Sequence, residues 1–294
     1  MGRARKIWDQ CRATLRRLGA QRKRPGQRYS DATVVLVDFW ATLNRQTALW
    51  ALDHWPGKRP PGGLPSPSRY SRRVRAPSIT TLRAKVRSRL WRADPIPPER
   101  LCLLVLDGFP LPVGLHTHDR QAGYGRGAGA MAKGYKLHLL LDAAGRVMAW
   151  RVAPMNIDER VMARRMVRGL PTGLAGYVLA DANYDDNPLF DLAQEAGLQL
   201  LAPRRRPRAG LGWRRHSPSR LRSIAALEAG QSRFGPSLHH QRGMIERRLG
   251  TLVSTPELNP QLPPWVRGYQ RVRRWIELKL IAYEFYRLGD RAGA

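Results

Sequence analysis

The sequence predicts an α/β domain, with a mixed sheet flanked by helices, preceded by a smaller helical region. After residue 98, short apolar runs typical of buried strands alternate with segments of helical periodicity. Before it, apolar residues recur at helical spacing between basic stretches. The proline-rich segment 94–98 separates these two patterns. We therefore expect a basic helical region at residues 1–98 and an α/β domain at residues 99–294.

The chain is strongly basic, with 52 Lys and Arg against 22 Asp and Glu and a formal net charge of +30. A polyanion relieves such self-repulsion, and nucleic acid fits best because Lys and Arg neutralise phosphates. No apolar run approaches the ~18 residues of a membrane span, and the basic N-terminus is a poor secretion signal. Cys11 and Cys102 have neither metal-ligand nor disulfide spacing. These features predict a cytoplasmic, nucleoid-associated protein that binds DNA.

The first 98 residues are expected to form short helices around 7–18, 31–43, 46–54, 66–75 and 78–91, with Asp31 capping the second. The helix at 66–75 has a Ser cap, an early Pro and several arginines, and no acid lies between His54 and Asp94. We expect a helix-turn-helix in which this helix enters the major groove. Arg69, Arg72 and Arg73 would share its DNA-facing side. The alternative interpretation is a solvated basic linker.

The second region predicts five strands and several helices. The strands are expected at 101–106 (ending at Asp107), 134–142, 146–152, 177–180 (ending at Asp181) and 198–201. The helices are expected at 157–169 with Asn156 as the cap, at 186–196, around Arg242 and Glu246, and at 265–288. Residues 204–222 read as a basic loop, and 124–129 as a glycine-rich hairpin loop that touches DNA and lacks the pattern of a P-loop.

Three carboxylates can converge if the fourth strand pairs beside the first. Asp107 and Asp181 would then end side by side, and a later helix would bring Glu246 over the same point, which is a ribonuclease H-like arrangement. Each residue also has a simpler interpretation. Asp107 can belong to a turn. The role of Asp181 could instead fall to one of three nearby aspartates, Asp185, Asp186 and Asp191. Glu246 can be a surface partner of Arg242.

Four motifs carry a family resemblance: Leu104-Val105-Leu106-Asp107-Gly108, Lys133-Gly134-Tyr135-Lys136-Leu137-His138, Leu179-Ala180-Asp181-Ala182-Asn183-Tyr184-Asp185 and Arg242-Gly243-Met244-Ile245-Glu246-Arg247. Their order and spacing, with 181 − 107 = 74 and 246 − 181 = 65, make the set specific. Residues 99–288 resemble the DDE transposases of bacterial insertion sequences, in the group with an Arg-x-x-x-Glu element.

The resemblance implies an enzyme in which Asp107, Asp181 and Glu246 bind two Mg²⁺ ions, with Mn²⁺ as a substitute. Water would free a 3′-OH, and this 3′-OH would attack target DNA. Arg242 would contact a phosphate or orient Glu246. The partners implied are DNA, at the element ends and the target, and further copies of the chain.

The sequence departs from the family pattern at two positions. His239 replaces a Tyr, and Val253 replaces a Lys, so phosphate contacts would fall to Arg247 or Arg248. His116 and His118 lack the further ligands of a zinc site and predict a surface loop. Two rival functions stay open: a nuclease of the same fold without strand transfer, and an inactive DNA-binding descendant.

Overall fold

The computed structural model describes residues 2–23, 25–95, 103–127, 129–170, 173–213, 215–228 and 233–291, without the side chains of 244, 245, 248, 249, 290 and 291. The chain forms two compact units. The first comprises Met1–Pro95, Leu252–Trp265 and Arg274–Ala294, and the second comprises Ile96–Thr251 and Val266–Arg273. The sequence predicted a single boundary near residue 98. The C-terminal segment instead belongs with the N-terminal helices.

The first unit is helical. Its helices are α1 (Arg3–Arg17), α2 (Asp31–Leu43), α3 (Ala48–Asp53), α4 (Pro67–Arg73), α5 (Pro77–Ala93) and the later turns of α10 (Tyr269–Arg291). The cap of α2 is Ser30 and not the predicted Asp31, because the Ser30 hydroxyl accepts a hydrogen bond from the Thr33 amide at 3.2 Å. Asp31 then lies in the first turn, where its charge favours the helix N-terminus.

Buried ion pairs join α10 to the N-terminal helices within this unit. Arg83 Nε lies 2.8 Å from Glu277 Oε2, and Arg274 Nε lies 3.1 Å from Asp38 Oδ2. The Tyr70 hydroxyl donates to Asp38 Oδ1 at 2.8 Å. Removing one partner of such a pair leaves a charge buried, so these contacts fix how the helices pack.

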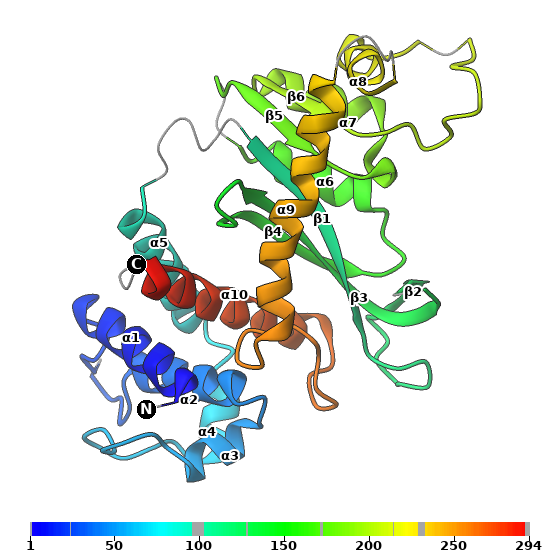
Figure 1. The fold of residues 1–294 in the computed structure, drawn as a ribbon. Helices are drawn as coiled ribbons and strands as arrows, with labels where there is room; N and C mark the ends of the chain where they lie inside the picture. Colours follow the sequence, from blue (N-terminus) through cyan, green and yellow to red (C-terminus); the bar gives the residue numbers. More distant parts are fainter. Residues whose placement is uncertain are drawn as a thin grey trace. The chain divides into compact units, whose positions relative to one another are not determined.

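The second unit contains one six-stranded sheet. Its strands are β1 (Leu103–Pro112), β2 (Gly123–Arg126), β3 (Met131–Asp142), β4 (Val147–Pro154), β5 (Gly176–Leu179) and β6 (Leu198–Leu201). They lie in the order β2-β3-β1-β5-β6, with β4 also paired to β3 (Figure 1). β1 is antiparallel to β3 and parallel to β5, so the fourth predicted strand does pair beside the first. This mixed sheet with flanking helices is a ribonuclease H-like fold.

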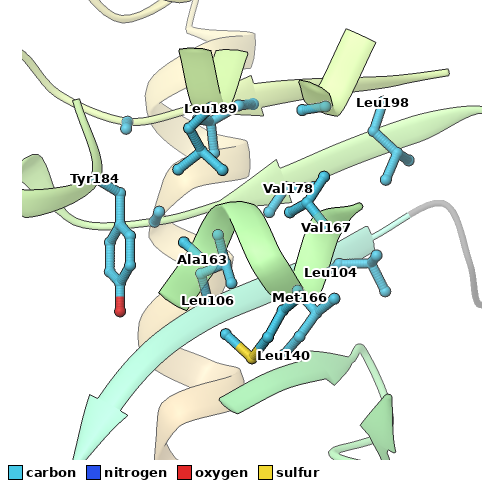
Figure 2. Close-up of a cluster of buried hydrophobic side chains, with 14 of the residues drawn as sticks. Leu104, Leu106, Leu140, Ala163, Met166, Val167, Val178, Tyr184, Leu189 and Leu198 are labelled. Carbon is cyan, nitrogen blue, oxygen red and sulfur yellow. The ribbon is translucent and has the colours of Figure 1, made fainter. Parts of the chain in front are cut away.

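One face of the sheet is covered by α6 (Glu159–Val167) and α7 (Asn187–Glu195). Leu104, Leu106 and Leu140 pack there against both helices, and all three are fully buried (Figure 2). Burying each such leucine contributes roughly 1.5–3 kcal/mol. Because strand side chains alternate, Val105 and Asp107 point to the opposite face, which α9 (Phe234–Ser254) crosses (Figure 1).

Several predicted boundaries were wrong. β1 continues past Asp107 to Pro112, because β3 extends back to residue 131 and pairs with it. Helix α6 begins at Glu159 and is capped by Asp158, whose carboxylate accepts from the Arg160 amide, rather than by Asn156. Part of the predicted loop 204–222 is helix α8 (Pro218–Glu228). The predicted hairpin loop includes a strand, since β2 pairs with β3 across a turn closed by Gly127 N and Ala130 O at 2.8 Å.

Candidate active site

Asp107 lies in the middle of β1, opposite Leu139 of β3. Its position is therefore fixed by the sheet on both sides of the residue rather than by a loop. The amide of Gly108 donates a hydrogen bond to Asp107 Oδ1 at 2.8 Å. The side chain lies on the sheet face that α9 crosses, and the residue is half-buried.

The pKa of Asp107 is raised to about 6, chiefly because burial disfavours its charged form. The negative charges of Glu246 and Asp181 act in the same direction, whereas the Gly108 hydrogen bond and the charge of Arg242 oppose them. These influences require the four side chains to share one electrostatic neighbourhood. Asp181, Glu246 and Arg242 are therefore near enough to influence the charge of Asp107.

Asp181 lies two residues beyond the end of β5 and caps the short helix η2 (Ala182–Tyr184). Its Oδ1 accepts from the Asn183 amide at 2.8 Å, and its Oδ2 accepts from the Asn183 side chain at 3.2 Å. Because β1 and β5 are parallel neighbours, the end of β5 lies beside the strand that carries Asp107. Asn183 therefore holds the Asp181 carboxylate in place at this edge.

Helix α9 supplies Arg242 and Glu246 one turn apart. Arg242 Nη1 lies 2.6 Å from Glu246 Oε1, and both side chains are partly exposed. Two turns before Glu246, His239 Nε2 lies 2.9 Å from the carbonyl oxygen of Ala180, the residue before Asp181. The ring nitrogen must donate to a carbonyl, so this contact ties α9 to the end of β5. The resembled family has Tyr at the position of His239, and no role for this histidine was predicted from the sequence.

A polar cluster lies on the α6 side of β1, directly behind Asp107. Lys136 and Glu159 form an ion pair, and a Cβ atom at Gly108 would lie 3.1 Å from Glu159 Oε2 and 3.5 Å from the Tyr184 hydroxyl. The Tyr184 hydroxyl points away from the apolar cluster that buries its ring (Figure 2). Glycine at 108 thus leaves room for these polar groups. In the sequence, the only sign that a residue without a side chain is needed here is the Gly that follows Asp107.

His138 belongs to the same region of the sheet, opposite Gly108 on β3. Its side chain is fully buried, and neither ring nitrogen has a hydrogen-bond partner among the described residues. Burial lowers the pKa of His138 to about 4, with Glu159 opposing this effect and Lys136 adding to it. The ring is therefore neutral at physiological pH, and Lys136 supplies the positive charge next to Glu159.

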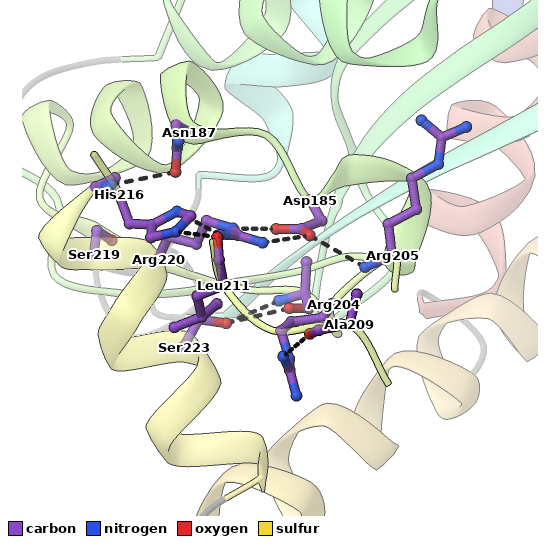
Figure 3. Close-up of polar contacts among 12 residues, drawn as sticks. Asp185, Asn187, Arg204, Arg205, Ala209, Leu211, His216, Ser219, Arg220 and Ser223 are labelled. Carbon is purple, nitrogen blue, oxygen red and sulfur yellow. Dashed lines mark hydrogen bonds and ion pairs between the residues drawn. The ribbon is translucent and has the colours of Figure 1, made fainter. Parts of the chain in front are cut away.

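The competitors of Asp181 are engaged elsewhere. Asp185 accepts two hydrogen bonds from Arg220, at 2.6 and 2.8 Å, and one from the Arg205 amide at 3.1 Å (Figure 3). Asp186 lies 3.2 Å from Arg164. Asp191 is exposed on α7. Of the aspartates from 181 to 191, Asp181 is the one that acts on the pKa of Asp107.

The Asp185 contacts anchor the basic loop between β6 and α8. Arg220 also donates to His216 Nδ1 at 2.8 Å, so the other ring nitrogen, His216 Nε2, carries the hydrogen that reaches the Leu211 carbonyl at 2.8 Å (Figure 3). Asn187 accepts from the Ser217 amide at 3.2 Å. The loop is therefore held at its base beside η2, while Arg205, Arg206 and Arg208 are exposed.

The predicted DNA contacts have different surroundings. Arg69 and Arg72 are exposed on α4, and Arg247 is exposed on α9. Arg73 forms an ion pair with Asp31 and is only partly exposed. The side chain of Arg248 lies outside the described residues. His116 and His118 are exposed, while Asp119 is buried and accepts from the Gly268 amide at 2.7 Å, as expected of a structured surface loop.

The chemistry of the carboxylate set suits a hard divalent cation, since Asp107, Asp181 and Glu246 offer oxygen ligands only. The pKa of Asp107 is raised mainly by burial, and the negative charges of Glu246 and Asp181 add to this effect. In the described part of the chain, no three His, Cys, Asp or Glu side chains are gathered closely enough to enclose a metal ion. Asp181 contacts Asn183 and Glu246 contacts Arg242 instead.

None of the helices among the described residues is both long and apolar enough to cross a membrane.

Comparison with known proteins gives one family. The model of the transposase DDE domain matches residues 98–285. Searches of curated proteins and of solved structures found no match to this chain. The family match spans β1 to α10 and includes both strands and the helix that carry the three carboxylates. The chain therefore belongs to the transposase DDE domain family.

Proposed function

We propose that this transposase cleaves and joins DNA strands with Asp107, Asp181 and Glu246 as the ligands of two divalent ions, Mg²⁺ or Mn²⁺. The observation that carries the proposal is the placement of the three acids: Asp107 lies on β1, Asp181 lies just beyond the end of the neighbouring strand β5, and Glu246 lies on α9. Asp107 is thus a half-buried carboxylate with two acidic neighbours that help to raise its pKa. Such a group favours either a proton or a metal cation. At neutral pH, a pKa of about 6 leaves the carboxylate mostly ionised and able to bind metal.

Two bound ions would supply charge stabilisation to the attacking and leaving oxygens of a phosphodiester displacement. The protein's own residues have separate tasks. β1 and β5 hold Asp107 and Asp181 on neighbouring strands, and α9 delivers Glu246. Arg242 balances part of the negative charge and can donate hydrogen bonds to a DNA phosphate. His239 positions α9 through the Ala180 carbonyl.

DNA is the proposed partner because the net charge is +30 and exposed arginines occur in both units. Arg69 and Arg72 in the helical unit, and Arg247 beside Glu246, would contact phosphates. Phosphate contacts of this kind release counterions, so binding would weaken steeply with salt, with a log–log slope of about −0.9 per contact. Assembly of several copies on DNA stays a prediction.

The test uses the purified full chain and a supercoiled plasmid carrying the reading frame with its flanking DNA. Asp107→Asn, Asp181→Asn and Glu246→Gln should each abolish Mg²⁺-dependent cleavage while DNA binding persists, because each removes one charged ligand at nearly constant volume. Asp191→Asn is the matched control, since this aspartate is exposed on α7. A triad variant that cleaves within about tenfold of the parent, a barrier change of only ~1.4 kcal/mol, would remove that residue from the site.

The same reactions separate joining from simple cleavage. Products in which a 3′ end is covalently linked to a second plasmid are expected if the protein performs strand transfer. Nicked or linear plasmid without such joints would identify a nuclease of the same fold, and absence of both would identify an inactive DNA-binding protein.

A further inference from the structure

A short turn joins helices α4 and α5 in the helical unit. α4 spans seven residues and ends at Arg73, and α5 begins at Pro77. The Ala76 amide donates to the Arg73 carbonyl at 2.9 Å, which closes the short turn between the helices. Tyr70 and Val74 are buried at this junction. A short helix, a tight turn and a longer helix are the outline of a helix-turn-helix.

The buried face of α5 fixes which side of the helix is outward. Ile79, Leu82, Val86 and Leu90 are buried at helical spacing. Arg83 lies on this inner face, where its Nε donates to Glu277 Oε2 at 2.8 Å. A charge-assisted contact inside a packed interface leaves the helix little freedom to rotate.

The outward face of α5 has a distinctive composition. Its centre carries the small residues Thr81, Ala84 and Ser88, with Thr81 and Ser88 exposed. Lys85 and Arg92 are exposed on one flank, and Arg87 on the other flank is exposed but lies 3.7 Å from Glu277 Oε1. Over its 17 residues α5 contains no acidic side chain. Small residues along the middle allow close approach to a surface, while long cations on both sides can reach phosphates.

We infer that α5, rather than α4, enters the major groove of duplex DNA and reads its sequence. The inference rests on the proposed function, in which this protein binds DNA. A helix of this length spans about 25 Å at 1.5 Å per residue, and the major groove, ~12 Å wide, admits one helix. Thr81 and Ser88 face the base edges, where hydroxyls can donate and accept. Lys85 and Arg92 face one phosphate backbone, and Arg87, which also lies near Glu277, faces the other.

Helix α4 has the properties of a backbone contact. It spans only seven residues, and its Arg73 is bound to Asp31. Arg69 and Arg72 are exposed and can neutralise phosphates as the first helix crosses the backbone. The nucleic acid that binds this surface is B-form DNA, because the major groove of duplex RNA is too deep and narrow to admit a helix.

The experiment uses the full chain and a library of random 30-base-pair DNA duplexes. Rounds of binding enrich a preferred duplex, which is compared with a shuffled duplex of the same composition. Thr81→Ala together with Ser88→Ala should lower the ratio of the two affinities at least about fivefold, with little change for the shuffled duplex. Arg69→Ala together with Arg72→Ala is the matched control and should weaken both duplexes alike.

Alanine at 81 and 88 preserves the helix, and equal thermal melting of both double variants checks that they fold. The proposal is overturned if the α5 variant keeps the affinity ratio, if the α4 variant is the one that loses it, if no preferred duplex emerges, or if duplex RNA competes equally well. These are binding measurements, so they are independent of cleavage. A triad variant that still cleaves would contradict the proposed function and leave this result standing.

Discussion

Asp107 and Asp185 are both shielded carboxylates in the sheet-containing unit, yet their surroundings act in opposite directions. Burial alone would raise the pKa of Asp185, but hydrogen bonds from Arg220 and from the Arg205 amide lower it below its ordinary value. For Asp107, burial and the two further carboxylates outweigh the Gly108 hydrogen bond and the charge of Arg242, so its pKa rises to about 6. Asp185 holds a loop in place, whereas the negative charge of Asp107 is not balanced by a hydrogen-bonded arginine among the described residues.

This difference separates a structural carboxylate from a candidate catalytic one without reference to any relative. A buried carboxylate that accepts two hydrogen bonds from one arginine has its charge balanced, and its role is structural. A buried acid with acidic neighbours is destabilised in the folded protein, and proteins retain such groups mainly at functional sites. The following four predictions test this contrast, from the largest expected effect to the smallest.

Arg220→Ala should lower the free energy of unfolding by about 3–5 kcal/mol, because it leaves the Asp185 charge buried without its partner. Urea denaturation of the full chain, followed by circular dichroism, measures the loss. Arg222→Ala is the control on the same helix, since Arg222 is exposed and donates to the neutral side chains of Gln199 and Gln194. A loss below about 1 kcal/mol for Arg220→Ala would mean that Asp185 is not held as described.

Asp107→Asn should stabilise the metal-free protein by roughly 2–3 kcal/mol above pH 7. The folded protein binds the Asp107 proton more tightly than the unfolded chain, so this group favours folding below about pH 4 and loses that contribution as pH rises through about 6. The difference between variant and parent should therefore grow between pH 4 and 7 and then level off. Urea denaturation in EDTA across this range measures it, and a constant difference would contradict the raised pKa.

Mg²⁺ should stabilise the parent at pH 8 by about 1.4 kcal/mol when its concentration is ten times the dissociation constant. Asp107→Asn should reduce this gain below about 0.5 kcal/mol, because a ligand charge is lost. Thermal melting with and without the ion measures both, and EDTA should reverse the effect. Equal gains in parent and variant would place the ion elsewhere in the protein.

Asp158→Ala should change stability by less than about 1 kcal/mol after allowance for the helix cap, although Asp158 forms an ion pair with Arg160. The Asp158 carboxylate is partly exposed, and solvent screens its attraction to Arg160, so the ion pair contributes little to the free energy of unfolding. Asp158→Asn retains a capping oxygen and should be nearly neutral. A loss as large as that of Arg220→Ala would show that burial is not what distinguishes the Asp185 pair.

The sheet and the carboxylate positions were accessible from the sequence because their signals are local. Apolar runs defined the strands that carry Asp107 and Asp181, and Gly197 marked the end of α7, with a φ of 85° that favours glycine. The boundary errors arose where a partner decides the end of an element. β1 continues beyond Asp107 because β3 extends alongside it, which no local pattern in β1 reveals.

The contacts around the site could not be predicted, since they join residues that are distant in the sequence. Lys136 meets Glu159, 23 residues away, and Arg73 meets Asp31, 42 residues away. The arginine spacing of α4 indicated a basic face but not that one member was already paired. His239 was noticed as a departure from the family pattern, and its contact with Ala180 depends on how α9 crosses the sheet.

The contact between Arg83 and Glu277 spans 194 residues and has a consequence for protein synthesis. The helical unit is completed by residues from the C-terminal helix, and the carboxylate set is completed by Glu246. A nascent chain that has not reached Glu277 lacks the residue that pairs with Arg83 of α5. Under the proposed function, the set of acidic ligands would be complete only after translation has passed Glu246 on α9, and the helical unit only after α10 has been made.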